Sequence, residues 1–529
     1  MVHLGFNGSG FFENYDSDSK KHFLELIKPG TEITLRVPGG SISRFTEPYS
    51  VRKGWGMTEA SVNRFFDQYE NLQPDEDDPE GGRDKWLRKV SEQPNYSYLD
   101  SLKELQAEIA SIGGKLNVIW VSNIINSSID EQVNTIKWLI DNNINLHAVE
   151  LGNEVYGKYN FDPAAYIRDY LALRTAVHAQ YPNVKFSIVS GNFRGRKDHA
   201  MWNETLRREL KISEYEFVTI HFYIVQAEYP TPYSKLPKTK IAIDYTKGNQ
   251  SLEDASKAYV SEIFEGTRFF QEITDAADFY GKPLLITEFN SKPSNSFGNF
   301  LVNGAWIMKQ LSDVVSPVTV DSICLHNGIA PDIYGVITLN QKQDAIRETM
   351  TKRIGWYSMF FALQPYVNDG FTKIDASVYN LSAEPKTITL SELFINDYIN
   401  YEVSGYRVLY VAGKYLYSSC GYIGHMNKSQ TPTYEIGNYT ELQLDPTTKT
   451  VTLPPNSYGT IIMQLSYVPG TTPEEPEEPE EEVETPTDST DVPTDNVDTN
   501  TDTGDTETDK PVAGIRYIKK LVKRLFKGS

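Results

Sequence analysis

The chain has 529 residues and a formal net charge of −20, and 39% of its residues are hydrophobic. That is enough apolar material for more than one core, so two or three structural units are expected. Much of the charge lies near the C-terminus: residues 471–509 hold 16 acids and no Lys or Arg, and residues 510–529 hold seven bases and no acid. The rest of the chain is also acidic, which argues against nucleic acid as its partner.

The N-terminus and the cysteines leave the cellular location of the protein open. Cys324 and Cys420 fall in different expected units and are interpreted as free thiols, so the redox compartment stays open. The N-terminus runs directly into a strand-like segment, with no secretory signal visible and no apolar run of transmembrane length. An extracellular place in a particle or surface assembly and a cytoplasmic place both fit this pattern.

From residue 1 to about 365, strand-like and helix-like segments alternate, which predicts parallel βα units. Helices are expected at 129–142, 163–180, 251–280 and 353–364. An insertion at 46–93, rich in Asp, Glu, Gly and aromatic residues, follows the second strand on the side where loops shape a substrate cleft. Eight strands fit a closed (β/α)8 TIM barrel in an α/β fold, with strands at 4–11, 33–37, 116–121, 146–151, 185–189, 217–222, 284–287 and 320–325.

Three further segments follow the barrel. Residues 366–468 have the short alternating pattern of an all-β sandwich domain, with strands expected at 371–381, 387–390, 406–411, 414–418, 440–444, 450–453 and 459–465. Residues 469–511 form a Thr/Pro/Glu/Asp tract that is expected to be a disordered acidic linker.

Residues 512–529 predict a basic amphipathic helix. Such a short helix is marginal alone and could be only a solvated basic end. It could also dock on an anionic membrane surface or on a larger assembly, such as a virus particle or cell-surface complex, with the acidic tract as a tether.

Two apolar runs end in glutamates. The run 146–151 leads to Asn153 and Glu154, and the run 284–287 ends at Glu288. Parallel barrel strands deliver such residues to their carboxyl ends, where these folds place their chemistry. Glycosidic bond cleavage needs such a pair of carboxyl groups: one protonated to donate to the leaving oxygen, and one ionised to attack or to activate water.

Simpler interpretations apply to parts of this pattern. A second Asn-Glu dipeptide, Asn203-Glu204, lies in a helix-like segment and is expected on its solvated face. Glu150 could be a salt-bridged barrel residue or a subsite contact, and the structural role is favoured. Position at a strand end and pairing with Glu288 favour Glu154 as the catalytic residue.

Three further segments carry a family resemblance: Arg36-Val37-Pro38-Gly39-Gly40, His221-Phe222-Tyr223 and the Leu-Pro-Pro-Asn-Ser-Tyr segment at 453–458. With Asn153-Glu154 and Glu288, they resemble the retaining glycoside hydrolases of clan A, closest to arabinofuranosidase-like members (families 51, 39 and 79), over about residues 1–467. The resemblance implies a (β/α)8 barrel with a C-terminal β-sandwich. It also implies that Glu154 is the general acid and base and that Glu288 is the nucleophile.

The resemblance also implies supporting roles. Arg36 and Tyr223 would keep Glu288 ionised, and the charge of Glu288 would in turn raise the pKa of Glu154. Asn153 would donate to the sugar 2-hydroxyl, and His221 would orient its neighbours. Gly39-Gly40 could be only a tight turn or could let the backbone approach the sugar. Additional substrate contacts are expected from Asn123, His326, Asn327 and Trp55, of which Trp55 could instead anchor the insertion.

Some features depart from the family or leave alternatives open. Phe289-Asn290 follows Glu288 where arabinofuranosidase-type members usually have tryptophan, so the sugar stays open. No His/Cys cluster has the spacing of a metal site and no Gly-rich phosphate loop is present, so no metal or cofactor is predicted. A carbohydrate is the expected substrate of a glycosidase. The competing interpretations are a non-catalytic carbohydrate-binding or adhesion protein on a barrel scaffold, and a transglycosylase that uses the same residues.

Overall fold

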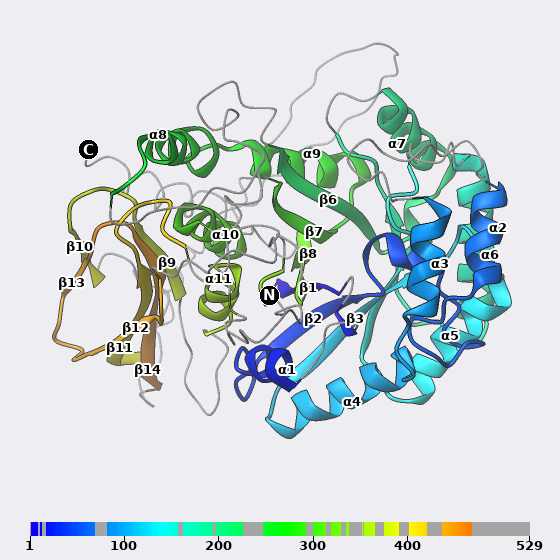
Figure 1. Cartoon of the computed structure of the whole chain (residues 1–529), viewed down its shortest axis with the longest axis horizontal. Helices are drawn as coiled ribbons and strands as arrows, with labels where there is room; N and C mark the ends of the chain where they lie inside the picture. Colours follow the sequence, from blue (N-terminus) through cyan, green and yellow to red (C-terminus); the bar gives the residue numbers. More distant parts are fainter. Residues whose placement is uncertain are drawn as a thin grey trace, which may run out of the picture.

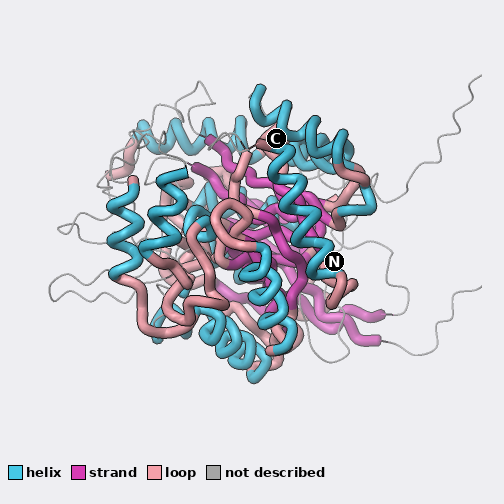
Figure 2. The backbone as a smooth tube through the Cα atoms, turned by 90° about the vertical axis from the view of Figure 1, so that its right-hand side faces the viewer, coloured by secondary structure: helices cyan, strands magenta, loops and turns pink. Residues whose placement is uncertain are grey.

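Eight parallel strands close into a barrel in sequence order, with β8 paired to β1 (Figures 1 and 2). The strands are β1 (His3–Asn7), β2 (Glu32–Val37), β3 (Lys115–Ser122), β4 (Leu146–Leu151), β5 (Phe186–Val189), β6 (Phe217–Val225), β7 (Leu284–Lys292) and β8 (Val320–Leu325). The computed structural model describes residues 2–8, 11–12, 17–68, 82–156, 162–193, 197–225, 247–292, 300–313, 319–329, 335–337, 352, 354–364, 375–390, 401–419 and 436–467.

The predicted barrel is confirmed, and β4 and β8 have the predicted bounds. The prediction ended β6 and β7 too early, because their apolar runs stop before their pairing does. The two strands remain paired past their polar residues, from His221 opposite Glu288 to Val225 opposite Lys292. This extension keeps the backbone around Glu288 in a hydrogen-bonded ladder.

Helices surround the barrel strands, as the cyan and magenta segments of Figure 2 show. They are α1 (Ser17–Leu24), α2 (Glu59–Gln68), α3 (Arg83–Ser91), α4 (Tyr98–Ser111), α5 (Ile129–Asp141), α6 (Pro163–His178), α7 (Lys197–Glu209), α8 (Gln250–Tyr259), α9 (Arg268–Tyr280), α10 (Leu301–Asp313) and α11 (Ile354–Leu363), with short turns η2 (Gly40–Arg44), η3 (Ile212–Glu214) and η6 (Val260–Phe264). Their starts follow capping chemistry: the Ser128 side chain accepts from the Glu131 N–H before α5, and the Asp162 side chain accepts from the Ala164 N–H before α6. No described helix is long and apolar enough to span a membrane.

The single helix predicted at 251–280 is wrong in one respect. The segment forms α8 and α9, separated by the π-helical turn η6. Gly266 follows that turn, and a Cβ atom there would lie 2.5 Å from the Glu262 carbonyl oxygen. Only glycine allows this close approach. The apolar periodicity of the sequence continues across the π-helical turn, so it does not reveal the break between the two helices.

The barrel interior has an apolar cluster of its own, formed by Ile119, Ala148, Phe217, Leu285 and Cys324. The sequence neighbours of these residues, such as Val118 and Val149, belong instead to the main core beneath the helices. Because side chains alternate along a strand, the cluster points inward. Cys324 is a buried free thiol, as predicted, whereas Cys420 lies outside the described residues.

Two antiparallel sheets follow the barrel. The strands β9 (Asp375–Asn380), β11 (Tyr401–Ala412), β12 (Thr440–Leu444) and β14 (Ser457–Tyr467) form one sheet, and β10 (Lys386–Thr389) and β13 (Thr450–Leu453) form the other. A separate core joins them, with Ile388 and Val451 from the smaller sheet and Val408 and Ile461 from the larger. This is the expected all-β part.

The predicted strand at 414–418 is wrong. The Tyr415 N–H donates to Ser418 Oγ and the Ser418 N–H donates to the Tyr415 carbonyl, which closes a turn instead of a ladder. Tyr417 Oη accepts from the Asn249 N–H at the start of α8. The alternating tyrosines therefore belong to a loop that packs on the barrel.

Helices α10 and α11 lie between the barrel and the larger sheet (Figure 1). All ten residues of α11 are buried. Tyr458 Oη of β14 donates to the Ile354 carbonyl at 3.0 Å. The predicted boundary at 365/366 falls in a gap between described residues, and the acidic tract and basic helix at 469–529 lie outside the described part of the chain, so these divisions stay predictions.

Candidate active site

Arg36 is the centre of a buried polar network at the carboxyl ends of the strands. Its side chain is fully buried. Nη1 donates to Glu288 Oε1 at 2.6 Å, and Nε donates to Glu150 Oε2 at 2.8 Å. Nη2 donates to Glu150 Oε1 and, at 2.8 Å, to Asn153 Oδ1. Glu150 therefore has the structural role that the sequence favoured, because its buried carboxylate balances the charge of Arg36.

Glu288 accepts from three side-chain donors. Asn7 Nδ2 lies 3.0 Å from Oε1, beside the Arg36 contact, and Tyr223 Oη lies 2.6 Å from Oε2. Asn7, which was not predicted from the sequence, is the last residue of β1. A polar residue that ends an apolar strand is the signal that identified Asn153, and it could have found Asn7 as well.

These contacts fix the charge of Glu288. Burial alone would raise the pKa of its carboxyl group. The neighbouring His221, His326 and Arg36 outweigh burial and the opposing charge of Glu154, and they lower the pKa to about 2. Glu288 is therefore a carboxylate across the physiological pH range, which a nucleophile requires.

Glu154 lies just past the end of β4, with a backbone φ of +47°. Such left-handed geometry is costly for a residue other than glycine and recurs at functional sites. One carboxylate oxygen of Glu154 lies within 4.8 Å of one from Glu288, and both lie near His221. His221 Nδ1 is 3.1 Å from Glu154 Oε1 and 3.7 Å from Glu288 Oε2. The structure thus brings the two predicted carboxyl groups together.

His221 joins the two carboxyl groups electrostatically. Its side chain is buried, which would lower the pKa of the imidazole. The charge of Glu288 and the hydrogen bond with Glu154 outweigh burial and Arg36, so the pKa of His221 is raised. These interactions with both carboxyl groups favour the orienting role expected for His221.

The Gly39-Gly40 pair leaves room for the network. A Cβ atom on Gly39 would lie 1.6 Å from Asn7 Oδ1 and 3.3 Å from Arg36 Nη1. Gly40 has a φ of +67°, which favours glycine. The pair is thus both a tight turn and a close approach to the side chains that hold Glu288.

The residues after β8 reach the same network. His326 Nδ1 lies 2.6 Å from Asn7 Nδ2 and 3.8 Å from Glu288 Oε2. Asn290, where the sequence departs from the family pattern, is buried and donates to the His326 carbonyl. Asn327 is also buried, and its backbone carbonyl accepts from the Val336 N–H. His326 thereby joins the site, and the predicted contact of Asn327 with substrate stays a prediction.

Trp55 and Asn123 hold the insertion in place. Trp55 is buried and its ring lies 4.3 Å from that of Tyr98, which favours the anchoring alternative. Asn123 Nδ2 donates to the Thr46 carbonyl at 3.2 Å. The predicted contact of either residue with substrate stays a prediction.

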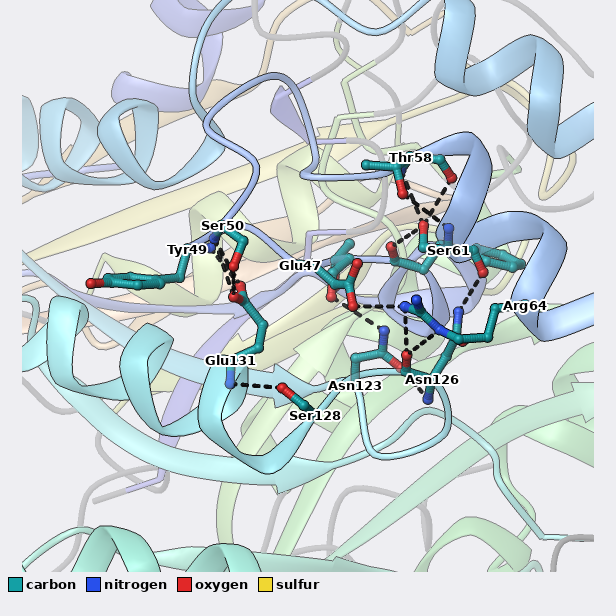
Figure 3. Close-up of polar contacts among 12 residues, drawn as sticks. Glu47, Tyr49, Ser50, Thr58, Ser61, Arg64, Asn123, Asn126, Ser128 and Glu131 are labelled. Atoms are coloured by element: carbon teal, nitrogen blue, oxygen red, sulfur yellow. Dashed lines mark hydrogen bonds and ion pairs between the residues drawn. The ribbon is translucent and has the colours of Figure 1, made fainter.

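Figure 3 shows the wider anchor of the insertion. Glu131 of α5 accepts from the Tyr49 N–H at 2.8 Å and also from Ser50. Arg64 Nε of α2 donates to Asn126 Oδ1 at 2.8 Å. The insertion is therefore bonded to α5 and to the loop that leaves β3, the strand paired with β4.

The second Asn-Glu dipeptide is only partly solvated, so that expectation needs correction. Asn203 is buried, because its amide both donates to the Gly191 carbonyl and accepts from the Gly191 N–H. Glu204 is exposed. Asn203 thus closes the loop after β5 and belongs to the framework.

The side chains of Glu154, His221 and Glu288 are close enough together to be metal ligands. Both oxygens of Glu288 already accept from Arg36, Asn7 or Tyr223, however, and a positive guanidinium lies where it would oppose a cation. Glu288 is therefore better suited to be a hydrogen-bonded carboxylate than a metal ligand.

Known proteins match this chain in fold. No family model and no curated protein matches the sequence. The structure of AbfB, a family 51 α-L-arabinofuranosidase from Bifidobacterium longum, superposes with a TM-score of 0.51 at 13% identity, covering 88% of this chain and 95% of that one. The chain shares the fold of that enzyme. The α-L-arabinofuranosidase from Thermotoga maritima superposes with a TM-score of 0.49 at 14% identity, covering 85% and 90%.

Proposed function

We propose that the chain is a retaining glycoside hydrolase that cleaves O-glycosidic bonds of an oligo- or polysaccharide by double displacement. The observation that carries the proposal is the pair of carboxylate oxygens of Glu154 and Glu288 within 4.8 Å. Retaining enzymes have carboxyl groups about 5–5.5 Å apart, whereas inverting enzymes leave about 6.5–9.5 Å for a water molecule. The shared fold is consistent with this reaction class.

Each carboxyl group has a distinct role. Glu288, which is ionised beside Arg36 and accepts a hydrogen bond from Tyr223, attacks the anomeric carbon while Glu154 donates a proton to the leaving oxygen. In the second step Glu154 removes a proton from water, which displaces Glu288 from the sugar. Asn153 would donate to the sugar 2-hydroxyl through its side-chain N–H, because its Oδ1 already accepts from Arg36.

A panel of aryl glycosides and polysaccharides tests the proposal, beginning with α-L-arabinofuranosides because of the AbfB fold. We expect one substrate to be cleaved, with the first-formed product keeping the anomeric configuration in time-resolved NMR. Glu154→Gln and Glu288→Gln should each lower kcat by about 10²-fold or more. Inversion of configuration would contradict the mechanism even if cleavage occurs.

The leaving group separates the two roles. A substrate with an acidic phenol needs little protonation, so glycosylation by Glu154→Gln should be nearly normal with that substrate and slow with a poor leaving group. Glu288→Gln should be slow with both. A 2-fluoro glycoside should label the wild type once, at Glu288, as mass spectrometry of peptides would show.

Two other functions predict different results. If a glycan binds equally well to the wild type and to Glu288→Gln but nothing is cleaved, the barrel is a carbohydrate-binding or adhesion protein. If product analysis shows transfer to an added sugar in preference to water, the enzyme is a transglycosylase with the same catalytic pair.

The C-terminal segment is a separate part of the proposal and rests on sequence alone. Its alternating apolar and basic residues suit attachment to an anionic membrane surface or a larger assembly. Vesicles with and without anionic lipid, mixed with the full chain and with a chain ending at Pro511, give the measurement. Equal binding of the two chains would remove this part of the proposal.

A further inference from the structure

A second polar cluster lies at the opposite end of the barrel from Glu154 and Glu288. His3 begins β1, His147 is the second residue of β4, and Asp321 is the second residue of β8. Strand β1 thus carries His3 at one end and the catalytic network's Asn7 at the other. In a TIM barrel this amino-terminal end is the stability face, so chemistry there is separate from the active site.

The three side chains converge on one point. One ligand-type atom from each of His3, His147 and Asp321 lies within 4.8 Å of the others. His147 Nε2 is 2.5 Å from Asp321 Oδ1, and the two imidazole rings are 4.7 Å apart and roughly edge to face. All three are partly buried, so they are shielded but reachable from solvent. The arrangement of these three side chains resembles that of ligands around a metal ion.

Neighbouring groups support the same cluster. The Glu32 carboxylate lies 3.7 Å from His3 Nδ1, and Ser322 Oγ donates to Asp321 Oδ1 at 2.7 Å. The ring of His147 stacks on Phe217, with centroids 5.7 Å apart. Carboxylates and hydroxyls that orient ligands, together with an apolar wall, are what surround protein metal sites.

We propose that His3, His147 and Asp321 bind a divalent transition-metal ion, with zinc as the best fit, at the amino-terminal end of the barrel. Two imidazoles and a carboxylate suit zinc, which takes four ligands, so a water molecule would complete the shell. The ligands come from β1 and β8, which form the closing seam of the barrel, and from β4 across it. The ion therefore links the first and last strands to β4, the strand that leads to Glu154.

The chain for the test is full length, purified without a polyhistidine tag and treated with a chelator. Zinc chloride titrated at pH 7.5 in a calorimeter should bind with one-to-one stoichiometry. Cobalt chloride in its place should give the visible absorption bands of a tetrahedral site. Because a ligand that binds only the folded state stabilises it, zinc should also raise the Tm of the wild type.

Three variants locate the ion. His147→Gln and Asp321→Asn should each lower zinc affinity by about tenfold or more and abolish the Tm increase. Asp321→Asn is isosteric, which keeps the test valid if His147→Gln does not fold. Glu154→Gln, in the other cluster of possible ligands, should bind zinc like the wild type.

The proposal is wrong if the wild type shows no saturable zinc binding, or if His147→Gln and Asp321→Asn bind as tightly as the wild type. It is also wrong if affinity falls only in Glu154→Gln, because the ion then lies at the catalytic end. None of these measurements uses glycosidase activity, so they are independent of the proposed reaction.

Discussion

Arg36 Nη1 lies 2.6 Å from Glu288 Oε1, although the two residues are 252 positions apart in the chain. The same guanidinium holds Glu150 and Asn153, so one cation organises side chains from β2, β4 and β7. A buried charge is tolerated only when it is paired and fully hydrogen-bonded, and Arg36 meets this condition through its carboxylate partners. Stability and the proposed catalysis therefore depend on the same residue.

Replacement of Arg36 should expose this dependence. Arg36→Met leaves Glu150 and Glu288 buried without a counter-charge, which should lower the free energy of unfolding by about 3–5 kcal/mol. Arg52→Met, which breaks an ion pair with Asp100 on the surface, should cost about 0–1 kcal/mol. Urea unfolding followed by circular dichroism measures both. Similar losses in the two variants would contradict the structural role of Arg36.

Acid should destabilise the protein through Glu288. Its pKa is about 2 in the folded chain and has the ordinary value of 4.5 when unfolded. Because the folded pKa is lower, the stabilisation is fully present above pH 4.5 and is lost as the pH falls toward 2. At about 1.4 kcal/mol per pKa unit, the loss is on the order of 3 kcal/mol.

Chemical unfolding at a series of pH values from 6 to 2 tests this acid dependence. Glu288→Gln has no carboxyl group to titrate, so its free energy of unfolding should fall less steeply over the same range. An unchanged slope in the variant would assign the acid sensitivity to other groups.

Tyr223 should matter for rate more than for folding. Its hydroxyl donates to Glu288 Oε2 at 2.6 Å, and hydrogen bonds to charged groups contribute about 1.5–3 kcal/mol. Tyr223→Phe should therefore lower kcat/KM by roughly 10- to 100-fold and move the acid limb of the pH–rate profile upward. Tyr215→Phe, whose hydroxyl faces the Tyr280 carbonyl far from this network, is the matched control. An acid limb that stays in place would show that Tyr223 does not tune Glu288.

Gly39 gives a test in which a single methyl group is added. In Gly39→Ala the new Cβ would lie 1.6 Å from Asn7 Oδ1, so the Asn7 amide must move away from Glu288. We expect a large loss of kcat with the fold retained. Gly82→Ala places a methyl group where nothing lies within 4 Å, and it should keep wild-type rates. Wild-type activity in Gly39→Ala would mean that the Asn7 contact is dispensable.

Patterns along the chain predicted much of this structure because they depend on the burial and local conformation of neighbouring residues. Buried parallel strands must be apolar, so the runs at β4 and β8 could be placed to the residue. Glu154 and Glu288 were found because polar residues at the ends of such runs are conspicuous. The break between α8 and α9 was missed, because it depends on the close approach of Gly266 to a carbonyl rather than on periodicity.

Contacts between distant segments could not be predicted in this way. His147 and Asp321 are 174 positions apart, and no spacing rule connects them with His3. The bonds of Glu131 to Tyr49 and Ser50 likewise depend on how the insertion folds back on α5. Barrel closure brings these pairs together, so they become visible only in three dimensions.

Helix α11 has no face turned to solvent, because the barrel covers one side and the larger sheet covers the other. Tyr357, Phe360 and Phe361 contact Gly437, Tyr439 and Tyr458 of the all-β part, so they would form an exposed apolar surface if the sheets were removed. A barrel released by proteolysis or by gene truncation near residue 365 would therefore tend to aggregate, and recombination that exchanges barrels should carry the C-terminal sheets with them. The barrel and the sheets therefore depend on each other for a stable, soluble fold.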